Sequence, residues 1–114
     1  MKKILLVDDS PVIRGFLKPV LEDAGHMVTI ADCSLEALVH LVGNPDFDYI
    51  LTDYRRPQMD GVEFAKAIQE KGIKIPVIMI TASPERINKD DQNIFLAIFS
   101  KPVQTEALKN LIER

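Results

Sequence analysis

A second cysteine, a tryptophan and a long apolar run are all missing from this sequence of 114 residues. With Cys33 alone, no disulfide can form within the chain, which suits a reducing compartment. The longest apolar runs have only the length of a strand, and the run before Asp8 is too short for a secretory signal. We therefore expect a cytoplasmic protein without a membrane partner.

An excess of positive charge is also missing. The 14 Lys and Arg residues are outnumbered by 17 Asp and Glu residues, which gives a net charge of -3. Without a basic stripe to neutralise phosphates, direct binding of nucleic acid is not expected. The composition, 46% apolar and 27% charged, is that of an ordinary globular protein, and the length fits one domain over residues 1–114.

Short runs rich in Val, Ile, Leu and Met alternate with segments of helical periodicity along the whole chain. This alternation predicts a parallel sheet. We expect strands at 3–7, 27–31, 49–53, 76–80 and 97–100, and the polar Thr29 makes the second of them an edge strand. The pattern indicates an α/β fold with a flavodoxin-like, doubly wound sheet of order 2-1-3-4-5 and helices on both faces.

Helix boundaries are marked by capping and turn residues. Ser10 and Pro11 begin the first helix and Gly25 ends it. A second helix starts near Ser34, where Leu35, Leu38, Val39 and Val42 recur at helical spacing. Further helices are expected at about 61–71 and 104–113, the last burying Ala107, Leu108, Leu111 and Ile112. The segment 85–94 has no clean apolar period and predicts only a short or irregular helix.

Carboxylates follow two of the predicted strands. Asp8 and Asp9 come directly after the first strand, and Asp53 ends the third. In the expected strand order these two strands are neighbours, and ligands bind at the carboxyl ends of such strands. Because three close carboxylates repel one another, a bound cation is the natural resolution. All-oxygen ligation suits Mg²⁺ better than zinc, for which the chain has no Cys or His cluster.

A hydroxyl and an amine are expected at the same edge of the sheet. Thr81 follows the fourth strand, and Lys101 follows the fifth. Lys101 can supply a positive charge and Thr81 a hydrogen bond to a phosphoryl group held beside the metal. Together with the carboxylates, these residues predict a phosphoryl-transfer site.

Each of these residues, taken alone, has a simpler explanation. A single Asp after a strand is usually a turn or cap residue, and Asp60 with Gly61 is most simply a turn into the third helix. The functional interpretation is favoured because these residues occur together: four of the five strand ends carry residues that one phosphoryl site needs.

The motifs together resemble the receiver domain of two-component response regulators. The stretches "VDDS", "ILTDYRRPQMDG", "MITAS" and "SKPV" stand in the order of that family and cover essentially the whole chain. The resemblance implies that Asp53 is the phosphoacceptor and that Thr81 and Lys101 contact the phosphoryl group. It implies direct Mg²⁺ ligation by Asp9 and Asp53, ligation by Asp8 through water, and a further ligand from the backbone carbonyl of Arg55. It also implies a cis peptide bond between Lys101 and Pro102.

The resemblance further implies the partners. A sensor histidine kinase or phosphotransfer protein would donate the phosphoryl group, and a downstream protein would bind the face formed by residues 85–94, 97–100 and 104–113. A phosphorylation-dependent dimer is also compatible with the resemblance. No enzymatic turnover is expected beyond slow self-dephosphorylation.

Two departures from the family pattern leave alternatives open. Ile98 stands three residues before Lys101, where the family commonly has Tyr or Phe, and the neighbouring Phe99 is the other candidate for that switch role. Arg55 and Arg56 flank the expected phosphorylation loop and either steer anions or are simply solvated.

Two other functions compete with a phosphorylated receiver. The first is a receiver-like binding module with a degenerate switch that works without phosphorylation, as Ile98 suggests. The second is a Mg²⁺-dependent phosphohydrolase of the haloacid dehalogenase type. Those enzymes usually place two acids two residues apart after the first strand, whereas Asp8 is followed by Asp9 and then Ser10.

Overall fold

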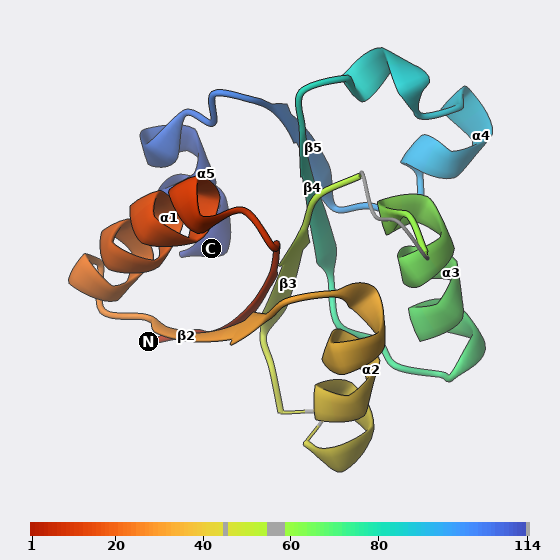
Figure 1. The fold of residues 1–114 in the computed structure, drawn as a ribbon, viewed down its shortest axis with the longest axis horizontal. Coiled ribbons are helices and arrows are strands. Elements are labelled where there is room, and N and C mark those ends of the chain that lie inside the picture. The colour runs from red at the N-terminus through yellow and green to blue at the C-terminus, as the bar shows by residue number, and fades with distance from the viewer. Residues whose placement is uncertain (45, 55–58, 114) are drawn as a thin grey trace.

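The computed structural model describes residues 1–44, 46–54 and 59–113. Its centre is a parallel five-stranded sheet of order β2-β1-β3-β4-β5 (Figure 1). The strands are β1 (Lys3–Val7), β2 (Met27–Ala31), β3 (Tyr49–Thr52), β4 (Val77–Thr81) and β5 (Ala97–Ser100). The predicted fold class and strand order are confirmed, with β2 at an edge. The ends of β3 and β4 differ from the predicted boundaries by one residue.

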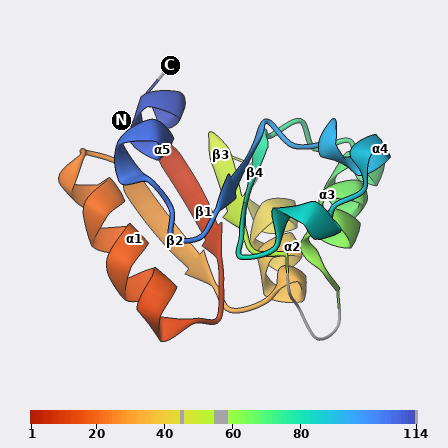
Figure 2. The same cartoon turned by 90° about the horizontal axis from the view of Figure 1, so that it is seen from above.

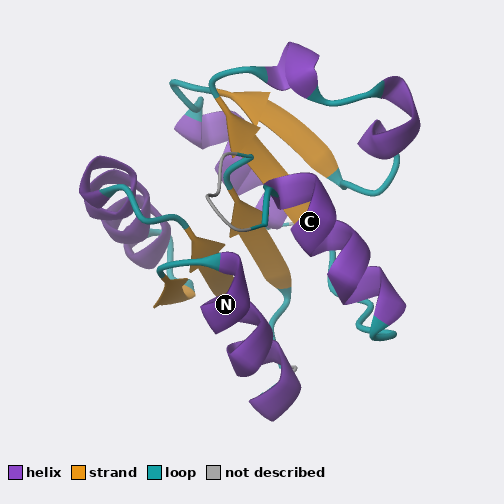
Figure 3. Ribbon diagram, turned by 45° about the vertical axis from the view of Figure 1, so that its right-hand side comes forward, coloured by secondary structure: helices purple, strands orange, loops and turns teal. Residues whose placement is uncertain are grey.

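Helices cover both faces of the sheet and give three layers (Figures 2 and 3). The helices α1 (Pro11–Asp23) and α5 (Thr105–Ile112) lie on one face. The other face is covered by α2 (Ser34–Gly43), α3 (Gly61–Glu70) and α4 (Lys89–Gln92). Within the described ranges, no helix combines the length and apolarity needed to cross a membrane.

Alternate side chains of each strand enter the two halves of the core. In β1, Leu5 and Val7 belong to the cluster beneath α2 and α3, and Ile4 and Leu6 belong to the cluster beneath α1 and α5. All four are essentially inaccessible to solvent. The continuous apolar runs of the sequence are explained by this burial on both faces.

Side chains cap the start of two helices, Ser10 as expected and Asp60 at the position where the sequence indicated a turn. The Ser10 hydroxyl accepts a hydrogen bond from the Ile13 N–H at the start of α1. The Asp60 carboxylate accepts from the Glu63 N–H, and the Glu63 carboxylate accepts from the Asp60 N–H, which forms a capping box at α3. Helix α1 ends just before Gly25, whose φ of 93° suits glycine.

The exposed face of α2 differs from the one that its sequence pattern suggests. Ala37 and Leu41 are the buried apolar residues of this helix. Leu35, Val39 and Val42, which signal the helix in the sequence, are all exposed. The spacing predicted the helix correctly but not which side of it faces the sheet.

The irregular segment before β5 contains a 3-10 turn (Pro84–Arg86) and the single turn of α4, as the missing period predicted. Ile87 and Phe95 anchor this segment in the core. Helix α5 buries Leu108 and Ile112. The expected burial of Ala107 is wrong, because this side chain lies on the solvent side of α5.

Candidate functional site

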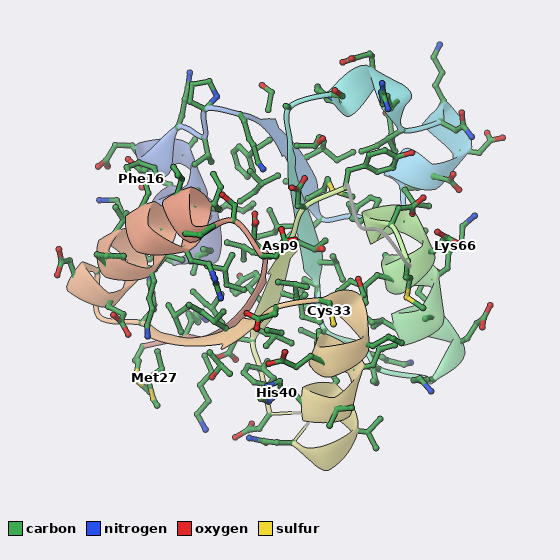
Figure 4. The ribbon with its side chains drawn as sticks, in the orientation of Figure 1. Asp9, Phe16, Met27, Cys33, His40 and Lys66 are labelled. Atoms are coloured by element: carbon green, nitrogen blue, oxygen red, sulfur yellow. The ribbon has the colours of Figure 1, made fainter. Side chains whose placement is uncertain are left out.

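The carboxyl ends of four strands bring the predicted site residues to one edge of the sheet. Asp8 follows β1, Asp53 follows β3, Thr81 ends β4, and Lys101 follows β5. Asp9 is exposed and lies at the carboxyl end of β1 (Figure 4). Parallel strands end at the same edge of a sheet, so residues separated by almost half the chain become neighbours.

An ammonium group joins two of the carboxylates. Lys101 Nζ donates a hydrogen bond to Asp53 Oδ2 over 3.0 Å, and it lies 3.9 Å from Asp8 Oδ2. The side chain of Asp8 is 4% exposed, that of Asp53 16%, and that of Lys101 22%. Because burial weakens solvent screening, Lys101 supplies part of the positive charge that the sequence assigned to a metal.

Backbone amides hold both carboxylates in place. Asp53 Oδ1 accepts from the Tyr54 N–H over 2.6 Å. Asp8 Oδ1 accepts from the Ser10 N–H over 2.8 Å, which links the site to the start of α1. Hydrogen bonds of this kind fix the orientation of the carboxylate.

A cavity of about 230 Å³ opens beside Asp53 and is lined by Asp53, Thr81, Ala82, Ser83 and Lys101. Thr81 is buried, and its Oγ1 accepts from the Ser83 N–H over 3.1 Å, so its own proton remains available to donate. The Lys101 N–H donates to the Thr81 carbonyl over 2.9 Å, which couples the two loops. The cavity therefore presents a carboxylate, a hydroxyl and an ammonium to a small anion.

The peptide bond between Lys101 and Pro102 is cis, as the family resemblance implied. This bond lies directly behind the ammonium-bearing residue of the cavity.

The donor chemistry of the site fits Mg²⁺. Asp8 and Asp53 offer hard carboxylate oxygens, and this ion is often held by only one or two carboxylates with several waters. Among the described residues, no group of three or more His, Cys, Asp and Glu side chains is arranged to hold a metal. The metal roles of Asp8, Asp9 and Asp53 stay predictions. The carbonyl of Arg55, and Arg56 beside it, lie outside the described residues.

Gly61 contributes to the site in a way that the sequence did not reveal. Its N–H donates to the Tyr54 carbonyl over 2.9 Å, next to Asp53 in the chain. A Cβ at this position would lie 2.6 Å from the Asp53 carbonyl oxygen and 2.5 Å from Met79 Cε. The sequence indicated a turn at Asp60 and Gly61, but the close approach to Asp53 depends on how α3 packs on the sheet.

The two faces of β5 separate the candidates for the switch residue. Ile98 packs against the core cluster beneath α2 and α3, whereas Phe99 packs against the cluster beneath α1 and α5. Phe99 therefore points to the opposite side of the sheet and does not replace an aromatic residue at position 98.

Comparisons with known proteins agree with this geometry. The family model described as the response regulator receiver domain matches residues 4–113. The response regulator receiver protein CpdR of Brucella abortus is 36% identical, with 100% of this chain and 96% of that protein covered. The chemotaxis protein CheY of Pseudomonas aeruginosa is 34% identical, with 98% of this chain and 94% of that protein covered.

Solved structures show the same similarity. The response regulator TrrA of Thermotoga maritima, in complex with Mg²⁺ and BeF, superposes with a TM-score of 0.89 at 28% identity. The alignment covers 99% of this chain and 97% of that one.

Proposed function

The chain belongs to the response regulator receiver domain family, and from this premise we propose that Asp53 accepts a phosphoryl group from a phosphohistidine. The donor is a sensor histidine kinase or a phosphotransfer protein. The observation that carries the proposal is the 3.0 Å contact of Lys101 Nζ with Asp53 Oδ2 at the wall of a small anion-sized cavity.

The transfer exchanges one bond for another. A carboxylate oxygen of Asp53 forms a bond to phosphorus while the bond between phosphorus and the histidine nitrogen breaks, and the imidazole takes a proton from solvent. The product is an acyl phosphate. Mg²⁺ held by Asp8, Asp9 and Asp53 would neutralise charge on the phosphoryl oxygens.

The side chains around Asp53 have separate tasks. Lys101 offsets the negative charge that gathers on the phosphoryl oxygens, and the Thr81 hydroxyl donates a hydrogen bond to one of them. The Tyr54 N–H keeps the carboxylate oriented before transfer. Because these donors are already in place, little reorganisation is needed during the reaction.

Phosphorylation would then alter a protein-binding surface. Lys101 and Thr81 are joined through their backbones, so added charge between them acts on the ends of β4 and β5. The surface of α4, β5 and α5 is adjacent and is the proposed binding face for a downstream protein, or for a second copy after phosphorylation. We assign the chain no enzymatic turnover beyond slow loss of its own phosphate, and a cytoplasmic location.

Intact-mass measurement tests the proposal. Incubation with acetyl phosphate or phosphoramidate and Mg²⁺ should add about 80 Da, the mass of one phosphoryl group. The variant Asp53→Asn should gain nothing, whereas Asp23→Asn, which alters an exposed residue at the end of α1, should behave like the wild type. An unchanged wild-type mass would overturn the assignment.

A further inference from the structure

Helix α2 is apolar on its solvent side as well as on its buried side. Leu35 is 50% exposed, Val39 73% and Val42 68%. Their spacing of four and then three residues places them on one face of the helix. Ala37 and Leu41 fill the opposite face, against the sheet.

These exposed side chains line a groove, which we call the α2 groove. It has a volume of about 580 Å³ and is bounded by Leu35, Leu38, Val39, Val42, Gly43 and Lys71. Lys71, at the end of α3, is the charged residue among them. Glu36 and His40, the polar side chains of α2 that contact each other over 3.8 Å, are not among the lining residues. Figure 4 labels His40 on this helix.

In the part of the chain that the structure describes, Val39 and Val42 are left uncovered and are among the most exposed large apolar side chains. Contiguous apolar surface of this kind commonly marks a site of protein interaction.

The dimensions of the groove favour a single helix over a second copy of the chain. The ten residues of α2 span about 15 Å. A stable dimer needs about 800 Å² from each partner, whereas three exposed side chains supply the apolar surface here. The exposed Lys71 lines the same groove and limits its apolar extent.

The charge at the rim adds a requirement on the partner. A helix lying over Val39 and Val42 would pass beside the Lys71 ammonium. A carboxylate on that flank of the partner would be attracted to it, and a basic residue would be repelled.

We infer that the α2 groove binds an amphipathic helix of a partner protein, with aliphatic residues at positions i, i+4 and i+7 and a carboxylate facing Lys71. The groove shares no residue with the cavity beside Asp53. The inference therefore does not require phosphorylation, and its test is separate from the test of the proposed function.

Two model peptides of about four helical turns test the inference. Both carry Leu at i, i+4 and i+7, and they differ only in having Glu or Lys on the flanks. Titrated into ¹⁵N-labelled protein, the Glu peptide should shift the amide resonances of Leu35, Val39, Val42 and Lys71. The Lys peptide should bind about two- to fivefold more weakly, as expected for one partly exposed ion pair.

Three variants sharpen the test. Val39→Glu should abolish the shifts, whereas Val12→Glu, the same change at a 76% exposed valine on α1, should retain them. Lys71→Glu should reverse the preference between the two peptides.

Several results would overturn the inference. They are the absence of shifts at millimolar peptide, shifts that map to another surface, and equal affinity for the two peptides. A wild-type dimer in light scattering that Val39→Glu dissociates would assign the groove to a second copy instead.

Discussion

Lys101 Nζ lies 3.0 Å from Asp53 Oδ2 and 3.9 Å from Asp8 Oδ2, so one ammonium group stands between the carboxylates that follow β1 and β3. Lys101 therefore contacts both carboxylates, and in the proposed reaction the same ammonium would contact a phosphoryl group on Asp53.

Lys101→Gln should slow phosphorylation by acetyl phosphate about 100-fold, the usual loss when one preorganised electrostatic contact is removed. The rate follows from a time course of intact mass. Lys109→Gln is the control, because Lys109 pairs with the exposed Glu106 on α5. Equal rates for Lys101→Gln and the wild type would remove Lys101 from the mechanism.

Replacing the Thr81 hydroxyl should show whether Thr81 acts through its hydrogen bond or only through the packing of its side chain. Thr81→Val keeps the shape of the buried side chain but removes the donor, and phosphorylation should slow about 10- to 100-fold, the loss of one hydrogen bond to a charged group. Thr81→Ser restores the hydroxyl and should recover most of the rate. If the Val and Ser variants react at the same rate, the hydroxyl has no part in the transfer.

Magnesium should stabilise the fold. At a concentration 100 times its dissociation constant, a ligand that binds only the folded state raises the free energy of unfolding by about 2.7 kcal/mol. Urea unfolding with Mg²⁺ and with EDTA at equal ionic strength measures this difference. Asp53→Asn should reduce it, and identical unfolding curves for the wild type in both buffers would contradict a metal site.

Gly61→Ala should destabilise the protein by about 1–3 kcal/mol, the cost of overpacking a fixed contact. The new Cβ would meet the Asp53 carbonyl oxygen at 2.6 Å, and this backbone atom cannot move without shifting Asp53 itself. Gly15→Ala in α1 is the matched control, because its Cβ would meet nothing within 4 Å. There, the greater helix propensity of Ala should stabilise the protein by about 1 kcal/mol. If Gly61→Ala and Gly15→Ala change the free energy of unfolding in urea by the same amount, the close approach of Gly61 to Asp53 does not affect stability.

The exposed pair of Lys3 and Asp46 should give a small pH dependence. The Lys3 ammonium donates a hydrogen bond to the Asp46 carboxylate over 2.8 Å, which lowers the pKa of Asp46 and raises that of Lys3. Because the folded pKa of Asp46 is depressed, its contribution to stability is present above the ordinary carboxyl pKa and is lost as pH falls through the folded value. Carboxyl resonances followed by NMR should show Asp46 titrating below 3.8 in the wild type and closer to it in Lys3→Met. An unchanged titration in the variant would show that Lys3 is not the cause.

Local sequence patterns were sufficient to predict the helices, the strands and the edge of the sheet at which the candidate site forms. Apolar runs of strand length that alternate with segments of helical period are typical of a parallel sheet covered by helices, so the five strands and their polar ends were predictable. Ser10 and Asp60 marked helix starts because they satisfy free backbone N–H groups locally.

Tertiary structure alone decided which surfaces meet. The period of α2 is the same whether Leu35 and Val39 or Ala37 and Leu41 face the sheet, and the structure buries Ala37 and Leu41. The position of Lys101 between two carboxylates, and the approach of Gly61 to the Asp53 carbonyl, likewise depend on how β5 and α3 pack. Local patterns specify period and capping, whereas contacts between residues distant in sequence arise only when the sheet and its helices come together.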